Sequence, residues 1–202
     1  MAEQTSRLVL ASGSKIRRQL LENSGILITV EPADIDEPAA VKDMQRSETA
    51  IPQLARGLAI RKAEAVSRRH PSALVIGADQ MLELDGRILT KADTPAIARD
   101  VLRSLRGRKH HLHSGVALVL GGQALWSHVG LATLQVRPFS DAWLDSYIAA
   151  NADALTTTVG AYQLEGEGIQ LFDRIEGDYF TILGLPLLEL LAELRRLGVI
   201  TE

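Results

Sequence analysis

Apolar and polar positions along the chain predict a mixture of short strands and amphipathic helices. Residues 73–76 (ALVI) are a continuous apolar run, which is typical of a strand buried on both faces. Two turn signals, Asp85-Gly86 and Gly121-Gly122, each separate two strand-like runs and predict β-hairpins. Further strands are predicted at residues 7–11, 26–30, 110–120, 123–137, 169–175 and 179–183.

Helices are predicted where apolar residues recur at helical spacing between capping signals. Ser14 is a predicted N-cap, and Gly25 a predicted end, for the first of them. The predicted helices cover residues 15–24, 48–69, 95–106, 141–150 and 187–197. The polar residues 38–47 predict a mobile loop. Because helices and strands do not strictly alternate and hairpins are prominent, we expect one α/β domain over residues 1–202, a mixed sheet with helices around it.

One lysine interrupts the apolar face of the long helix predicted at residues 48–69. Leu58 and Val66 lie one turn to either side of Lys62 on that face. The ammonium group either extends to the edge of the helix or projects into a polar cavity. The sequence alone does not decide between these two interpretations.

Acidic side chains occur at two places where they could take part in chemistry. Asp79 follows the buried run 73–76, and a carboxylate there must be paired or functional because burying it unpaired is costly. Asp34, Asp36 and Glu37 lie together in a predicted loop. Such a cluster is either simply solvated or a source of oxygen ligands for a hard divalent cation.

A strand, a small-residue turn and a helix with two arginines follow one another at residues 7–18. Backbone N–H groups at the helix start, together with Arg17 and Arg18, could bind an anion. An ordinary capped helix with a solvated basic face explains the same pattern.

His111 and His113 share one face of a predicted strand, a spacing that two metal ligands could use. No third ligand is near, so we expect ordinary half-exposed strand residues there.

Composition narrows the class of protein without identifying it. The 202 residues are 46% apolar and 23% charged with a formal net charge of −3, so neither nucleic acid nor an anionic membrane is expected as a partner. The absence of cysteine excludes disulfides, thiolate metal sites and a cysteine nucleophile. No run approaches the length of a membrane span and no targeting segment is evident, so we expect a cytoplasmic protein.

Nine segments occur in the order found in Maf-family proteins, over residues 7–197. They are LVLASGSKIRRQLL, DIDE, LAIRKAEAV, VIGADQ, LDGRILTK, GVAL, GAYQLEGEGI, RIEGDY and GLPL. The chain therefore resembles Maf proteins, which are house-cleaning nucleoside triphosphate pyrophosphatases. The resemblance implies an elongated mixed sheet flanked by helices, with two lobes and a cleft between them as in the related ITPases, and a possible homodimer. It also implies a divalent metal cofactor, Mg²⁺ or Mn²⁺.

The resemblance also assigns roles to individual residues. Asp79 falls on the family's catalytic proton acceptor, and Glu37 on the glutamate of its DIDE segment, which would hold the metal with Asp79 or position the water. Lys62 and Lys91 fall on two lysines suited to a triphosphate. Ser14 and Arg17 fall on its substrate-binding turn. Phosphoryl transfer depends mainly on positioning and charge neutralisation, which such a set supplies.

Base choice is implied by three further positions. Gln80 and Glu165 resemble the branch that acts on 7-methyl-GTP rather than the branch that acts on dTTP and UTP, whereas Ile16 replaces the tryptophan typical of the former. Lys15, Ser114 and Ala92 also differ from the usual family residues, but none of these changes removes a charged group. The alternative function is a non-catalytic nucleotide-binding regulator of cell division and septum formation. Direct nucleic-acid binding through the arginines is disfavoured by the acidic net charge.

Overall fold

The structure, a computed structural model, describes residues 8–47 and 50–201, and it contains a seven-stranded mixed sheet. The strands follow the order β2-β1-β3-β5-β6-β7, with β4 paired to β3. Strand β1 is parallel to β2 and β3, whereas β3–β4 and β6–β7 are antiparallel. The strands are β1 (Leu8–Leu10), β2 (Thr29–Val30), β3 (Leu74–Leu84), β4 (Arg87–Leu89), β5 (Lys109–Leu120), β6 (Gln123–Val136) and β7 (Phe172–Glu176). The predicted mixed α/β class is confirmed.

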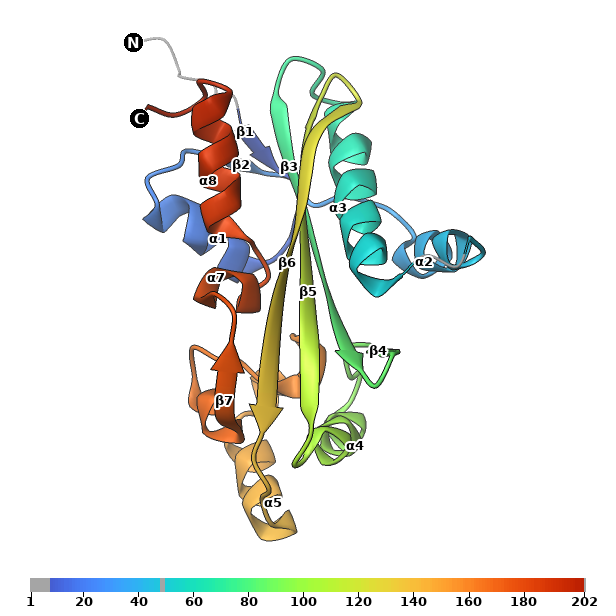
Figure 1. Ribbon diagram of the computed structural model, residues 1–202, viewed down its shortest axis with the longest axis vertical. Coiled ribbons are helices and arrows are strands. Elements are labelled where there is room, and N and C mark those ends of the chain that lie inside the picture. The colour runs from blue at the N-terminus through green and yellow to red at the C-terminus, as the bar shows by residue number, and fades with distance from the viewer. Residues whose placement is uncertain (1–7, 48–49, 202) are drawn as a thin grey trace. The chain divides into compact units, whose positions relative to one another are not determined.

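The chain divides into two compact units. Unit 1 comprises residues 1–79, 114–130 and 179–202, and unit 2 comprises residues 80–113 and 131–178. The helices of unit 1 are α1 (Lys15–Asn23), α2 (Glu37–Gln45), α3 (Ile51–Ser67), α7 (Tyr179–Ile182) and α8 (Leu187–Arg196). Within this unit, α3 lies on one side of the strands and α1 and α8 lie on the other (Figure 1).

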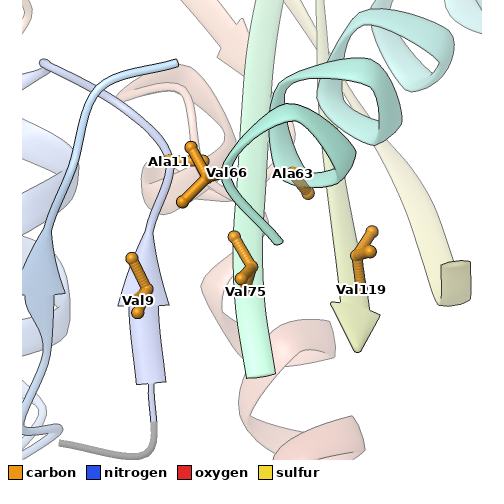
Figure 2. Close-up of a cluster of buried hydrophobic side chains, with 6 residues drawn as sticks. All are labelled: Val9, Ala11, Ala63, Val66, Val75 and Val119. Atoms are coloured by element: carbon orange, nitrogen blue, oxygen red, sulfur yellow. The ribbon is translucent and has the colours of Figure 1, made fainter. Parts of the chain in front are cut away.

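Small apolar side chains join α3 to the strands of unit 1. The cluster consists of Val9, Ala11, Ala63, Val66, Val75 and Val119, and all six are fully buried or nearly so. Figure 2 shows the two helical residues, Ala63 and Val66, above Val9, Val75 and Val119 of three strands. Burying a valine side chain stabilises a fold by about 1.5 kcal/mol or more relative to leaving it exposed, so this cluster holds the helix firmly.

Two glycines let the backbone of α3 approach the sheet closely. A Cβ atom on Gly77 of β3 would lie 2.0 Å from the carbonyl oxygen of Ala59. A Cβ atom on Gly115 of β5 would lie 2.4 Å from the carbonyl oxygen of Ala55. Because neither position has room for any side chain, helix and strands pack backbone against backbone. This contact sets the height of α3, and therefore of its side chains, above the strands.

Unit 2 contains β4, β7 and parts of β3, β5 and β6, together with helix α4 (Pro95–Leu105) and further short helical segments. Helix α4 contacts α5 (Asp141–Ala150), α6 (Ala152–Leu155) and the 3₁₀ turn η1 (Val159–Ala161). A second 3₁₀ turn, η2 (Glu167–Leu171), leads into β7. The predicted hairpin turn after β3 is confirmed, since Asp85 and Gly86 both have positive φ, at 48° and 75°.

Several elements differ from the sequence-based prediction. Residues 38–47 are not a loop, because α2 covers most of them; Asp36 caps this helix by accepting from the amide of Ala39 at 2.9 Å. Most of the strand predicted at residues 179–183 is helix α7 (Tyr179–Ile182); a short apolar run does not by itself distinguish a strand from a helix. The strand predicted at residues 26–30 is limited to Thr29–Val30. Helix α3 begins at Ile51, and the predicted start at Glu48 lies outside the described residues.

A buried histidine in unit 2 makes stability depend on pH. His110 is 0% exposed and its Nε2 lies 2.7 Å from the hydroxyl of Tyr162. Burial, assisted by the neighbouring His111, lowers the pKa of His110 from 6.5 to about 4. Below pH 6.5 the unfolded chain therefore binds a proton that the folded chain refuses, and stability falls as the pH falls towards 4.

We expect the free energy of unfolding to fall by about 3 kcal/mol between pH 7.5 and pH 4 through this group alone. Urea unfolding at several pH values would measure how the free energy of unfolding depends on pH in wild type and in His110→Gln. Between pH 7.5 and pH 4 this free energy should fall by about 3 kcal/mol less in His110→Gln than in wild type. His128→Gln, at a partly buried position on β6, is the control and should keep the wild-type pH dependence. Equal slopes in wild type and His110→Gln would contradict the assignment.

Among the helices of the described residues, none combines the length and the apolar character that crossing a membrane requires.

Candidate active site

Three charged side chains of unit 1 converge on one point. The Nζ atom of Lys62 lies 2.6 Å from Oδ1 of Asp79 and 2.8 Å from Oε1 of Glu37. Asp79 and Lys62 are 6% and 9% exposed, whereas the side chain of Glu37 is 50% exposed. One ammonium group thus bridges a buried carboxylate and a half-exposed one.

Each of the three is positioned by the element that carries it. Asp79 lies on β3 two residues after Gly77, where α3 approaches the strand most closely. Lys62 lies on the face of α3 that also carries Leu58 and Val66, so packing of that face directs its side chain towards the sheet. Glu37 is the first residue of α2, immediately after the cap Asp36. Lys62 is therefore buried against two carboxylates and does not extend to the edge of the helix. A polar cavity around it stays a prediction.

Burial dominates the electrostatics of the central carboxyl group. It raises the pKa of Asp79 above its ordinary value, while the positive charges of Lys62 and Arg17 act in the opposite direction. Glu37 contributes a further, smaller upward effect. A carboxylate whose pKa is raised towards the working pH is a stronger base than an ordinary one. Asp79 is thus the residue of this cluster best suited to accept a proton.

Arg17 is fixed beside this cluster by backbone and hydroxyl acceptors. Its Nε donates to the carbonyl of Gly184 at 2.8 Å. Its Nη1 donates to the carbonyl of Ala78 at 3.0 Å and to Oγ of Ser12 at 3.1 Å. Burial lowers the pKa of the Arg17 guanidinium, and the nearby carboxylates of Asp79 and Glu37 oppose that effect. The arginine therefore ties three segments of unit 1 together around the residue preceding Asp79.

The turn before α1 is the predicted capped helix start. Ser14 is the N-cap, and its Oγ accepts from the backbone amide of Arg17 at 3.4 Å. Ile16 lies in the first turn of α1 and is partly exposed.

The sequence pattern that describes the family "Maf-like protein" matches residues 7–197. The chain belongs to the Maf family.

Curated Maf relatives match the chain over nearly its whole length. A protein named 7-methyl-GTP pyrophosphatase from Rhizobium etli is 46% identical over 97% of this chain and 98% of its own length. One of the same name from Rhizobium meliloti is 48% identical, covering 96% and 97%. A protein named nucleoside triphosphate pyrophosphatase from Maricaulis maris is 48% identical, covering 98% and 100%.

Among solved structures, a HAM1 protein from Coxiella burnetii overlaps partly with this Maf chain. The TM-score is 0.43 with 19% sequence identity, over 64% of this chain and 72% of that one. The family assignment rests on the sequence matches.

The remaining residues assigned from the Maf resemblance belong to unit 2. Gln80 directly follows Asp79 in β3 and is partly buried. Lys91 lies between β4 and α4 and is exposed, as is Glu165 in the turn before η2. Unit 1 therefore contains Ser14, Ile16, Arg17, Glu37, Lys62 and Asp79, of which Glu37, Lys62 and Asp79 are in direct contact. The predicted base-selecting pair Gln80 and Glu165 and the second lysine belong to the other unit.

The two histidines His111 and His113 of β5 each contact another side chain. His113 is buried rather than half-exposed, and its Nε2 lies 2.6 Å from Oε2 of Glu83. His111 contacts Oγ1 of Thr133 through Nδ1, at 2.9 Å. Across residues 8–47 and 50–201, no group of three or more His, Asp or Glu side chains is arranged to hold a metal ion.

Sequence reasoning missed the partners of Arg17. Ser12 stands two residues before the predicted cap, and its hydroxyl was the one detectable signal, a polar side chain at the end of a buried strand. The carbonyls of Ala78 and Gly184 carry no side-chain signal at all.

Proposed function

We propose that this Maf protein hydrolyses a nucleoside triphosphate to the monophosphate and pyrophosphate, with Asp79 as the base. The observation that carries the proposal is the buried Asp79 held 2.6 Å from Lys62 beside Glu37 and Arg17. Near-complete alignment with proteins named for this activity supports it. In the proposed reaction, the bond between the α- and β-phosphates breaks as water adds, and Asp79 takes a proton from that water.

The positively charged side chains of the cluster are proposed to bind the phosphates and to neutralise their charge. Lys62 neutralises charge on the triphosphate, which is the main requirement of phosphoryl transfer, and the family resemblance implies the same role for Lys91. Arg17 adds fixed positive charge and holds the backbone at Ala78, so that Asp79 keeps its orientation. Ser14 presents the start of α1, where amide groups favour an anion.

Glu37 and Asp79 fit a divalent cation such as Mg²⁺ or Mn²⁺. Both carboxylates already lie within 2.8 Å of one positively charged atom, Nζ of Lys62, so they can face a common cation. Two carboxylates plus phosphate oxygens are a usual ligand set for Mg²⁺. When bound, such an ion lowers the pKa of a coordinated water and screens the phosphate charge.

A panel of natural and methylated nucleoside triphosphates, each with Mg²⁺ or Mn²⁺, tests the function. We expect pyrophosphate and monophosphate to appear in equal amounts from at least one nucleotide. Release of orthophosphate in place of pyrophosphate would contradict the proposed bond cleavage. Tight binding without turnover across the panel would overturn the enzyme in favour of a nucleotide-binding regulator.

Base selection is proposed to lie with Gln80, Glu165 and Ile16. The carboxylate of Glu165 suits 7-methylguanine, since it accepts from the ring N–H and amino group and favours the positive charge of the methylated ring. Ile16 cannot stack as an aromatic residue would, so contacts from Gln80 and Glu165 carry more of the selection.

Glu165→Gln is expected to lower the preference for 7-methyl-GTP over dTTP by about 10-fold or more, since a hydrogen bond to a charged group contributes about 1.5–3 kcal/mol. Ratios of kcat/KM for the two nucleotides measure the effect. Glu167→Gln, two residues further on and hydrogen-bonded to Asn151, is the matched control and should keep the wild-type ratio. A Glu165→Gln ratio equal to that of wild type would remove Glu165 from the base site.

A further inference from the structure

The Lys62 ammonium group lies between the two carboxylates that are proposed to hold the metal ion. Its Nζ contacts Oδ1 of Asp79 at 2.6 Å and Oε1 of Glu37 at 2.8 Å, which are ordinary distances for charge-assisted hydrogen bonds. The lysine is 9% exposed, so these contacts are little screened by water. The protein thus supplies its own cation to the cluster.

We infer that Lys62 is an internal counter-ion that competes with the divalent metal for Glu37 and Asp79, so that the metal enters the site together with the nucleotide and not before it. The inference rests on the proposed function and adds to it an order of binding. Two cations a few ångströms apart repel each other strongly when partly buried, so the ammonium group and the metal ion do not share both carboxylates.

The triphosphate of the nucleotide offers Lys62 a new partner in place of the two carboxylates. Triphosphate oxygens are anionic acceptors, so they offer Lys62 an alternative partner when it leaves the carboxylates. Lys62 has the freedom to make this exchange, because Glu37, one of its two partners, is half-exposed and begins a helix at the edge of the cluster. In the absence of nucleotide the same lysine keeps Asp79 paired, which removes the cost of leaving that buried carboxylate without a partner.

Mn²⁺ binding without nucleotide tests the competition directly. Electron paramagnetic resonance of free Mn²⁺ during titration of the full chain gives the dissociation constant. We expect weak binding by wild type, and binding at least about tenfold tighter in Lys62→Met and Lys62→Gln, because both remove the competing charge. Lys62→Arg, which keeps the charge, should bind as weakly as wild type.

Arg61→Met is the matched control. Arg61 is the neighbouring residue of α3, and its guanidinium pairs with Asp43 at 2.7 Å, outside the cluster. Arg61→Met loses one positive charge, as Lys62→Met does. The difference between their dissociation constants for Mn²⁺ therefore isolates the direct competition. Thermal unfolding of each variant shows whether it is folded.

Two results would overturn the inference. One is Mn²⁺ binding by the Lys62 variants no tighter than by Arg61→Met. The other needs no variant: a micromolar dissociation constant for Mn²⁺ and wild type in the absence of nucleotide. Neither bears on pyrophosphate release, so failure of the competition is distinguishable from failure of the proposed function.

Discussion

Asp79→Asn is expected to lower the rate of pyrophosphate release by about 10²- to 10⁴-fold, the usual contribution of a positioned base. The amide has the same size as the carboxyl group but accepts no proton at neutral pH. Lys62 keeps its contact with Glu37, so the fold and nucleotide binding should persist. Single-turnover measurements with saturating nucleotide separate this loss from any change in affinity.

Asp43→Asn is the control for loss of a carboxylate near the same helices. Asp43 is exposed on α2 and pairs with Arg61, not with Lys62. This variant should keep wild-type turnover. If Asp79→Asn retained a rate within a few-fold of wild type while Asp43→Asn did the same, another group would have to be the base.

Gly77→Ala is expected to be the most destabilising small substitution in unit 1. Its Cβ atom would lie 2.0 Å from the carbonyl oxygen of Ala59 and 2.8 Å from Cβ of Ala63, so α3 must move away from β3. Overpacking typically costs about 1–3 kcal/mol, and because the new Cβ meets backbone we expect about 3 kcal/mol for Gly77→Ala. In a chain of this length that corresponds to a fall in Tm of about 6–12 °C, which differential scanning calorimetry would detect.

The same substitution should also impair turnover below the unfolding temperature, because Lys62 moves with α3. A displacement of about 1 Å at a catalytic group is enough to lower rates about 10²-fold. Gly13→Ala is the control, since its Cβ atom would meet only Pro32, at an ordinary 3.6 Å. A Gly77→Ala protein with the Tm of Gly13→Ala would show that α3 does not rest on β3 as described.

Local signals predicted most elements of the fold. Ser14, Thr94 and Ser140 each cap the predicted helix through a side-chain oxygen, and these helices begin where expected. Both glycine-containing hairpin turns are present, with positive φ at Gly86 and Gly122. The polar α2 and the four-residue α7 were missed because neither has a clear apolar periodicity, so caps and tertiary contacts decide them.

The centre of the site was also accessible from sequence. A lysine on the apolar face of a helix and an aspartate at the end of a buried run each require a partner, and they are each other's. The sequence did not pair them, since the contact depends on how closely α3 approaches β3. Gly77 was the available signal, because glycine inside a strand indicates close backbone approach.

The hydrogen bond from Arg17 to Gly184 has a consequence for biosynthesis. It joins residues 167 positions apart, and the second of them follows all of unit 2 in the chain. During translation Arg17 lacks this acceptor until the ribosome has passed codon 184. A nascent chain that stalls earlier should therefore lack one of the contacts that fix Arg17 beside Ala78, even after its first strands and α3 have formed.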